Sequence, residues 1–522
     1  MNRRLFATLV PVTALVVGIA TQGPSLASAH GTAAKAAPPV PAPASSPASL
    51  GTIRTISYQP VGARGGSVGL SYDLWATYNP TQVQSDLALI KGTGANAVRV
   101  FISTGDTGSS YPQVSATFTR SLSNFVRLAH NAGLQAVLSI FNQFPYIPTD
   151  LAGWSDTTSA SAWMAAVVNP YQSDPDIAYI EMRNEVPAPG YDSPDPVGSG
   201  LLAATWLNTM VPRLRNDAGT DPIVLSNNHG VAGYEALDAA LSSAAKPDAF
   251  SYHFYDWPGF LYGQLTALQH ELSRPVFVGE TGMSTATSYA QGGAAGLTAD
   301  TVVRDSYQGW YLQAVASVTW ALGMGVPAVW QLWDTPNAKS ASEADYGLFD
   351  DSTGNPVPKP AVATLSKIYA AAAAGLPISP PSINGNFDDP GTAVGTEVPS
   401  PWNSYYIAGQ TSPSSAQGGQ SLCITYAGTD SYFYQALPLA GVTGAHVLSV
   451  WSKGGNGYTS VALRWLDMSG NPIGPDVRTW QPGGQSNWYQ LVVNGIAPAG
   501  ASTVEVILQG DTSDCFSNVI FS

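Results

Sequence analysis

Hydrophobic positions divide the chain into two regions with different periodicities. From residue 51 to 374, short apolar runs alternate with amphipathic stretches. Consecutive apolar positions over such short lengths are typical of parallel strands buried on both faces. We therefore expect eight strands, at Ser67–Ser71, Ala95–Ile102, Leu134–Phe141, Ile177–Met182, Pro222–Ser226, Asp248–His253, Pro275–Gly279 and Pro327–Trp333.

Amphipathic stretches between these runs predict helices. Pro80–Lys91 begins with a proline, which suits the first helical position. Thr119–Ala132 carries its apolar residues on one face, and Thr301–Leu322 follows the N-capping residue Asp300. Alternating strands and helices predict a (β/α)8 barrel over residues 51–374. A doubly wound sheet is the alternative, but the glycine-rich stretch Gly62–Gly69 begins before the first predicted strand, whereas phosphate loops follow it.

Residues 383–522 show strict alternation instead, as in Val447–Trp451, Val461–Trp465 and Val504–Leu508. This pattern predicts a β-sandwich, joined to the barrel by a proline-rich linker at residues 375–382. Overall, the predicted fold class is α/β, a TIM barrel followed by an all-β domain.

The N-terminus has the features of an export signal. Arg3 and Arg4 precede the apolar stretch Leu5–Ala20, and Ala27–Ala29 fits a cleavage site. We predict a signal peptide at residues 1–29, a disordered Ala/Pro/Ser-rich linker at residues 30–50, and a secreted protein without a membrane anchor. The alternative is an anchoring helix, for which the apolar stretch is short of the ~20 residues required.

Composition narrows the function classes. Charged residues make up 11% of the chain, the net charge is −14, and the 21 Lys and Arg form no cluster, which argues against nucleic-acid binding. The 14 Trp and 24 Tyr suit a carbohydrate partner, although a neutral secreted protein without a special ligand has a similar composition. The two cysteines and six histidines show no metal-ligand spacing, so we expect no metal or cofactor. In an oxidising compartment, Cys423 and Cys515 are expected to form one disulfide.

Two glutamates end predicted strands. Glu185 follows the fourth strand and Glu280 closes the seventh. Barrel enzymes place catalytic groups at these strand ends, and the fourth and seventh strands lie on opposite sides of the ring. Glycoside hydrolysis with retention requires two carboxyl groups ~5–5.5 Å apart, so these residues are the candidate catalytic pair.

The barrel region resembles glycoside hydrolase family 5, the cellulase and β-mannanase family. The resemblance implies that Glu185 is the acid/base and that Glu280 is the nucleophile. An acid must start protonated, so burial and the second carboxylate are expected to raise the pKa of Glu185. The resemblance also implies supporting or substrate-binding roles for Arg99, Asn184, His253, Tyr255 and Trp330. Trp257 and Trp333 are further candidates for substrate contact, and weaker ones after strand ends are Tyr72, Trp75, Asn142, Asn228 and His229. Glu181 is expected to be a buried structural acid.

The C-terminal region resembles CenC-type carbohydrate-binding modules, whose aromatic rings stack on sugars. We therefore predict a monomeric, retaining hydrolase of β-linked polysaccharide, with endo-β-1,4-mannanase or endo-β-1,4-glucanase activity. The alternatives are an exo-glycosidase or transglycosylase on the same barrel, or a non-catalytic carbohydrate-binding protein.

Overall fold

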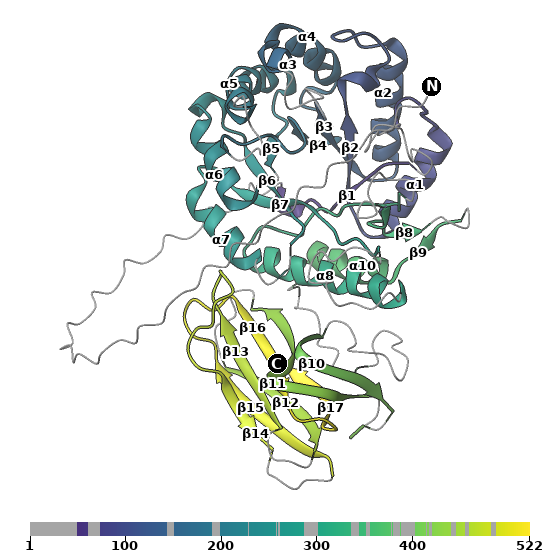
Figure 1. Cartoon of the computed structure of the whole chain (residues 1–522). Coiled ribbons are helices and arrows are strands. Elements are labelled where there is room, and N and C mark those ends of the chain that lie inside the picture. Colours follow the sequence, from purple (N-terminus) through teal and green to yellow (C-terminus); the bar gives the residue numbers. More distant parts are fainter. Residues whose placement is uncertain are drawn as a thin grey trace, which may run out of the picture. The chain divides into compact units, whose positions relative to one another are not determined.

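A computed structural model of the chain shows two folded regions, which we describe separately (Figure 1). The residues that it describes are 50–60, 74–142, 151–190, 199–227, 229–256, 258, 261–286, 301–335, 344–350, 355–376, 378, 387, 402–413, 415–416, 420–439, 445–454, 459–481 and 487–521. The predicted signal peptide, the N-terminal linker apart from Leu50, and most of the second linker lie outside these residues.

The N-terminal region contains a parallel sheet in which each strand pairs with the next one along the chain. All residues of these strands are buried except the first of β3, because the sheet is covered on both faces. The seven strands are β1 (Thr55–Ser57), β2 (Ala97–Ile102), β3 (Gln135–Ile140), β4 (Ile177–Glu181), β5 (Ile223–Asn227), β6 (Ala249–Phe254) and β7 (Val276–Thr281).

The segment around Val329 closes this sheet into a ring. Val329 forms bridges to Ile56 of β1 and Thr281 of β7, and its amide donates to the Thr55 carbonyl at 2.9 Å. The predicted eighth strand therefore occupies its expected place, and the (β/α)8 fold is confirmed. The predicted first strand, Ser67–Ser71, lies outside the described residues, and the first barrel position is taken instead by β1.

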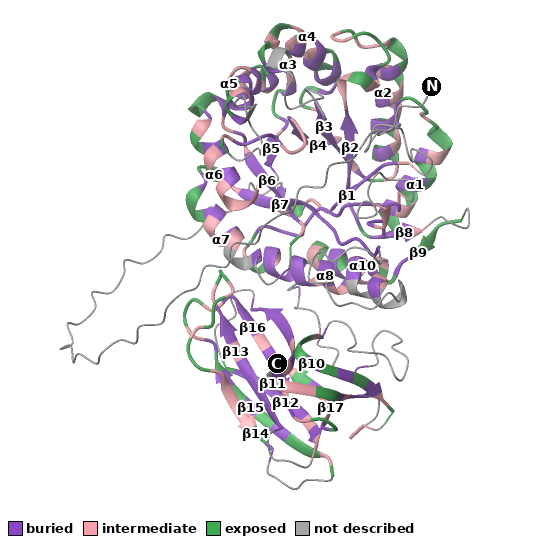
Figure 2. Cartoon of the chain, viewed as in Figure 1, coloured by how far each residue is buried: buried purple, intermediate pink, exposed green. Residues whose placement is uncertain are grey.

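Helices surround the parallel strands (Figure 1). Their inner faces are buried and their outer faces exposed (Figure 2), which accounts for the amphipathic pattern of the sequence. Capping residues fix their starts: Asn79 accepts bonds from Thr81 and Gln82, and Ser115 accepts one from Phe118. The helices are α1 (Pro80–Gly92), α2 (Ala116–Asn131), α3 (Leu151–Ser155), α4 (Thr157–Val168), α5 (Ser199–Ala218), α6 (Gly230–Ala240), α7 (Leu261–Glu271), α8 (Thr301–Ala321) and α10 (Pro360–Ala373). Within the described residues, none is long and apolar enough to cross a bilayer.

The C-terminal region is antiparallel and folds into two layers joined by one long strand, β11 (Ser421–Pro438). The first part of β11 pairs with β17, which continues to β12 and β15, while its last part pairs with β16, which continues to β13 and β14. Apolar side chains of both layers form a common core. The remaining strands are β10 (Asn403–Ser412), β12 (Ala445–Lys453), β13 (Ser460–Leu466), β14 (Val477–Trp480), β15 (Tyr489–Ile496), β16 (Thr503–Gln509) and β17 (Cys515–Phe521).

A disulfide crosses this domain. Cys423 of β11 and Cys515 of β17 are direct partners in the strand register, and their sulfur atoms are bonded. The structure thus contains the predicted disulfide, which closes a segment of 92 residues.

Candidate active site

Arg99 is the centre of a buried network at the carboxyl ends of the barrel strands. It lies on β2 and has no exposed surface. Its Nε and Nη2 atoms donate to Glu181 Oε2 at 3.0 and 2.6 Å, and Nη1 donates to Glu280. Nη2 also donates to Asn184 Oδ1 at 2.7 Å. One guanidinium therefore fixes side chains from β4, β7 and the loop after β4, using the planar array of donors that arginine provides.

Glu280 is the penultimate residue of β7 and is held by two donors, one from β2 and one just after β6. Arg99 binds one carboxylate oxygen, and the Tyr255 hydroxyl donates to the other at 2.5 Å. Burial, and then the charge of Glu280, raise the pKa of Tyr255 well above its ordinary value, so this hydroxyl keeps its proton. Both oxygens are thereby oriented, as a nucleophile that must reach one carbon atom requires.

Glu185 lies beyond the end of β4 in a left-handed backbone conformation, with φ of 53°. For a residue with a Cβ this conformation costs about 1–2 kcal/mol. Two residues that sequence reasoning missed hold it. Arg183 donates to the carbonyls of Asn184, at 2.9 Å, and of Glu185, while Ser226 Oγ accepts from the Glu185 amide at 2.9 Å. Because these contacts depend on the backbone turn, only the position of Arg183 beside Asn184-Glu185 could have drawn attention to it.

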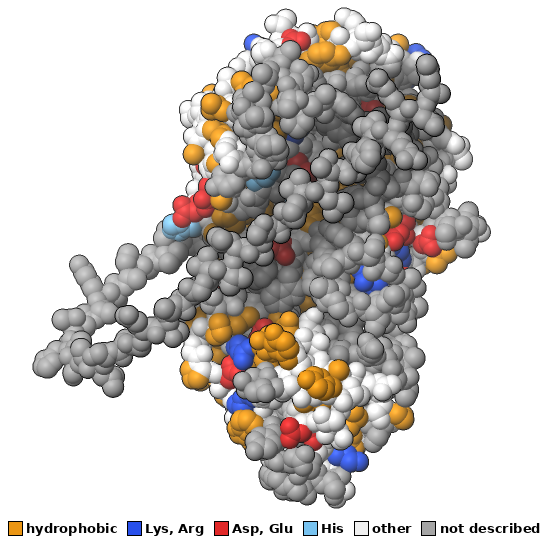
Figure 3. All heavy atoms as spheres, in the orientation of Figure 1, with side chains coloured by type: hydrophobic (Ala, Val, Ile, Leu, Met, Phe, Trp, Pro, Cys, Tyr) orange, Lys and Arg blue, Asp and Glu red, His pale blue; other side chains and the backbone are white. Residues whose placement is uncertain are grey.

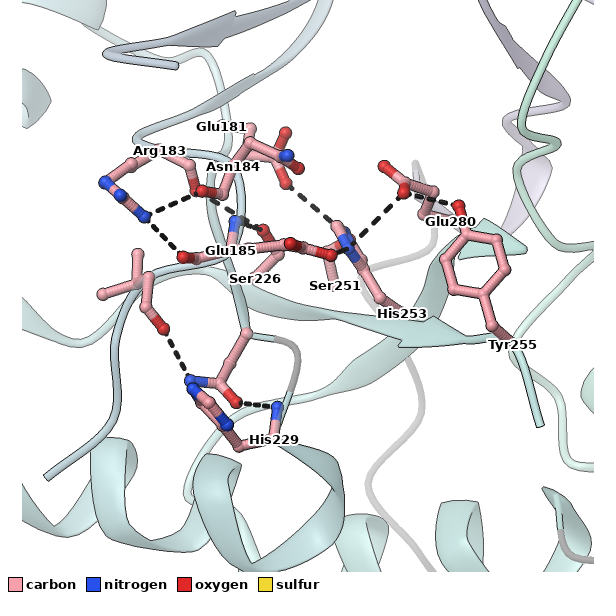
Figure 4. Close-up of polar contacts among 12 residues, drawn as sticks. Glu181, Arg183, Asn184, Glu185, Ser226, His229, Ser251, His253, Tyr255 and Glu280 are labelled. Carbon is pink, nitrogen blue, oxygen red and sulfur yellow. Dashed lines mark hydrogen bonds and ion pairs between the residues drawn. The ribbon is translucent and has the colours of Figure 1, made fainter. Parts of the chain in front are cut away.

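His253 of β6 lies between the two candidate catalytic carboxylates (Figure 4). Its Nδ1 atom is 3.1 Å from Glu185 Oε1 and 3.8 Å from Glu280 Oε1. Its Nε2 atom faces Glu181 Oε1 at 3.8 Å, and among the described residues neither of these two buried atoms has a closer hydrogen-bond partner. The imidazole is thus surrounded by three carboxylates.

These three carboxylates determine whether His253 or Glu185 carries the proton that the pair shares. Burial alone would lower the pKa of His253, but Glu280, Glu181 and Glu185 outweigh it and raise the pKa to about 10. Burial alone would raise the pKa of Glu185, yet the hydrogen bond and charge of His253 lower it. The expected rise in the pKa of Glu185 is therefore wrong, because the cationic His253 has more influence than burial or the second carboxylate.

Glu181 is buried, as expected, and is ionised. Burial opposes its charge, but Arg99 and then His253 lower its pKa to about 2. Burial alone would lower the pKa of Arg99, but the carboxylates of Glu181 and Glu280 raise it. Glu181 therefore compensates the two buried cations of the site.

Two of the three tryptophans predicted to contact substrate, Trp330 and Trp333, lie within the described residues. Trp330 packs edge to face on Phe101 at 5.6 Å and belongs to a cluster with Tyr346 that contacts Tyr255. Trp333 is 3% exposed and packs in the main barrel core against Phe349, and Trp330 is buried to a similar degree, at 5%. Contact of Trp330 or Trp333 with a sugar stays a prediction. Trp257 lies outside the described residues.

The structure describes three of the five weaker candidates. Trp75 is a core residue whose indole donates to the Phe101 carbonyl at 2.7 Å. Asn142 is buried beyond β3, and the His229 amide donates to Asn227 at 2.6 Å. Tyr72 and Asn228 lie outside the described residues.

Among the described residues, Glu185, His253 and Glu280 could in principle chelate a cation, since one ligand atom of each lies within 4.8 Å of the others. Both oxygens of Glu280 already accept bonds from Arg99 and Tyr255, and His253 carries a proton at neutral pH. The donor set is therefore poorly suited to a metal, whose binding requires neutral imidazole. The expectation of no metal stays a prediction.

The chain is similar to several known proteins. The mannan endo-1,4-β-mannosidase of Cellvibrio japonicus (strain Ueda107) is 26% identical over 235 residues, which cover 41% of this chain and 48% of that protein. The chain thus spans about half the length of this curated relative. Two similar solved structures are an exo-β-1,4-mannosidase from Opitutaceae bacterium strain TAV5 (17% identity, TM-score 0.46, 62% of this chain and 60% of that chain) and a GH5_18 protein from Streptomyces cattleya with GlcNAc (14%, 0.49, 63% and 82%).

A family model covers the part of the chain that contains the network of Arg99, Glu185 and Glu280. It is described as cellulase, glycosyl hydrolase family 5, and it matches residues 56–335. This range runs from β1 to the segment that closes the ring, and it makes up more than half of the chain. The chain belongs to glycosyl hydrolase family 5.

Proposed function

We propose that the chain is a secreted retaining glycoside hydrolase that cleaves β-linked mannan or glucan by double displacement. The observation that carries the proposal is the separation of the two carboxylates: an oxygen of Glu185 and one of Glu280 lie within 4.8 Å of each other. Retaining enzymes hold their carboxyl groups ~5–5.5 Å apart, whereas inverting enzymes need ~6.5–9.5 Å to admit a water molecule.

In the first step, Glu280 attacks the anomeric carbon while Glu185 protonates the departing glycosidic oxygen. Arg99 and Tyr255 orient Glu280, and their bonds weaken as its charge passes to the new ester. Asn184 accepts a bond from Arg99 through Oδ1, which leaves its amide hydrogens free to bind the 2-hydroxyl of the sugar. In the second step, Glu185 takes a proton from a water molecule. The oxygen of this water attacks the anomeric carbon and breaks its ester bond to Glu280.

Glu185 must carry a proton in the first step, and His253 is its source. A substrate that displaces water from the site removes solvation from the ion pair between them, which favours the neutral pair of Glu185 carboxylic acid and imidazole. The proton then moves over the 3.1 Å contact from Nδ1 to Oε1. His253 acts here as a positioning residue that holds the catalytic proton.

For the substrate we propose β-1,4-mannan first and β-glucan second. The relative from Cellvibrio japonicus is a mannan endo-1,4-β-mannosidase, and the family is that of the cellulases. The 14 Trp and low charge of the chain also suit a neutral polysaccharide. We further propose that the antiparallel domain binds carbohydrate, and that residues 1–29 direct secretion.

The test is hydrolysis of glucomannan, galactomannan, β-glucan, xylan, xyloglucan and carboxymethylcellulose by the purified chain and its Glu280→Ala variant. Glu271→Ala is the matched control, since Glu271 is an exposed glutamate at the end of α7. We expect short oligosaccharides from a mannan-containing polymer, lost with Glu280→Ala and retained with Glu271→Ala. Equal activity of both variants would refute the assigned site. Release of only monosaccharides would favour the exo-acting alternative.

A further inference from the structure

Three tyrosines lie next to one another on an outer face of the antiparallel domain. Tyr405 of β10 and Tyr432 of β11 are direct partners in the strand register, and their rings stack at 5.1 Å. Tyr434, two residues along β11, meets Tyr432 edge to face at 5.8 Å. Phe433 between them points into the core, so the three tyrosines point away from it. Tyr405 is 45% exposed, although a ring of this size usually gains by burial.

Charged side chains continue this face across the neighbouring strands. Arg464 of β13 donates to the Tyr432 hydroxyl at 2.9 Å, and its guanidinium lies 5.2 Å from the centre of that ring. Asp476 accepts two bonds from Arg464, at 2.9 and 3.0 Å, and Glu505 of β16 accepts a third at 3.3 Å. The tyrosine platform is therefore joined to a fixed array of donors and acceptors.

The array ends at another exposed aromatic residue. Arg478 of β14 donates to Asp476 at 2.9 Å and to Ser460 at 2.8 Å. Its guanidinium lies 5.5 Å from the ring centre of Trp480, which is 52% exposed. Two arginines and two carboxylates balance each other, so the strip from Tyr405 to Trp480 carries no net charge. In Figure 3, hydrophobic, acidic and basic side chains alternate on the visible surface of this domain.

We propose that this strip, from Tyr405 through Tyr432 and Arg464 to Trp480, binds a neutral polysaccharide chain that runs across the strands. Sugar rings present apolar C–H faces, which stack on aromatic rings, and hydroxyl groups, which bond to guanidinium and carboxylate groups. The strip crosses the strands in the order β10, β11, β16, β13 and β14. At about 4.8 Å between neighbours, it is on the order of 19 Å long, which suits an extended chain.

The arrangement favours a polysaccharide over a protein partner. Protein interfaces bury a broad patch with an apolar centre, whereas this strip has aromatic rings at its two ends and a polar middle. Its polar groups already bond to one another, so little side-chain entropy is lost when a ligand binds. The choice of a neutral glycan rests on the proposed function of the barrel as well as on the balanced charge of the strip.

The proposal is tested by affinity gel electrophoresis of the full-length chain carrying Glu280→Gln, so that the polymer is not consumed. The gels contain glucomannan as the neutral ligand or polygalacturonate as the anionic one. The test variants are Tyr405→Ala, Tyr432→Ala and Trp480→Ala, each added to Glu280→Gln. The matched control is Tyr489→Ala, which removes a tyrosine that is 39% exposed on β15, in the other layer. Circular dichroism verifies that each variant is folded.

We expect glucomannan to retard the parent chain and polygalacturonate to leave it unaffected. Each variant of the strip should weaken the association constant about tenfold, and Tyr489→Ala should leave it unchanged. The proposal is overturned if the parent binds no neutral polymer, if polygalacturonate binds more strongly, or if the control weakens binding as much as the test variants. This assay measures binding without turnover. A barrel without hydrolytic activity would therefore leave its result unchanged, whereas a strip that binds no polymer would abolish the effect of the three test variants.

Discussion

The Nδ1 atom of His253 lies 3.1 Å from Oε1 of Glu185. The pKa of His253 is raised to about 10 and that of Glu185 is lowered, so the proton of this pair resides on the imidazole. The acid catalyst is then better described as the pair than as Glu185 alone. Two interacting groups share the titration, and the pair loses its proton only at alkaline pH.

Replacing His253 should therefore change the pH profile of catalysis. In His253→Asn the proton must reside on Glu185 itself, and a carboxyl group, even when burial raises its pKa, loses its proton at lower pH than the imidazole of His253 does here. We expect the alkaline limb of kcat/KM to move to lower pH, whereas a purely structural role would lower the rate equally at all pH values. The measurement is kcat/KM between pH 4 and 10 (roughly the range over which these groups titrate).

Glu181 should contribute to stability through its charge. Its pKa is lowered from 4.5 to about 2 in the folded chain, which corresponds to about 3 kcal/mol. Because the folded pKa is the lower one, this stability is present above pH 4.5 and is lost as the pH falls towards 2. We expect Glu181→Gln to reduce the unfolding free energy at pH 7 by about 3 kcal/mol, and the difference from wild type to shrink in acid. Urea unfolding at several pH values tests this, with Glu271→Gln as the exposed control; a constant difference would contradict it.

Arg183 should affect turnover more than stability. Its bonds to two loop carbonyls hold Glu185 in the left-handed conformation, and without them the acid/base can turn away from the bond to be cleaved. We expect Arg183→Ala to lower kcat about tenfold or more, with a small change in KM. Arg120→Ala, on the exposed side of α2, should leave both constants unchanged. An unaltered kcat in Arg183→Ala would show that the loop needs no such support.

The disulfide should stabilise the antiparallel domain only. It closes 92 residues, for which the chain-entropy model gives about 4–5 kcal/mol. We expect Cys423→Ser/Cys515→Ser to lower the unfolding temperature of this domain and to leave hydrolysis of a soluble oligosaccharide unchanged. Calorimetry and activity assays of the same samples decide this. Loss of activity in the folded variant would show that the barrel depends on the disulfide.

The sequence predicted β2 to β7 to within two residues, because long apolar runs bounded by glycine, proline and polar residues mark buried strands. It missed β1, since Thr55–Ser57 is a three-residue strand with only one apolar residue. The closing segment was predicted as a strand and forms bridges mainly through Val329. Short strands at the point where the ring closes are stabilised by the neighbouring strands rather than by a hydrophobic pattern of their own.

In the candidate active site, too, some features could be predicted from the sequence and others could not. Glu185, His253 and Glu280 could be recognised because each stands near a strand end, and Arg99 because it lies in a distinctive context within β2; the structure brings the four together. The direction of the pKa shift of Glu185 could not be predicted from the sequence, because it depends on a 3.1 Å contact with His253, a residue from another strand. Contacts of this kind arise from the closed ring and have no signature in the linear sequence.

The most direct test of the central claim is the anomeric form of the first product. Proton NMR recorded during hydrolysis of a β-linked mannan or glucan oligosaccharide distinguishes the β from the α anomer before they interconvert. With oxygens of Glu185 and Glu280 within 4.8 Å of each other, the account predicts that the β anomer appears first. Initial release of the α anomer would mean inversion, and it would contradict the assignment of Glu280 as a nucleophile that forms a covalent intermediate.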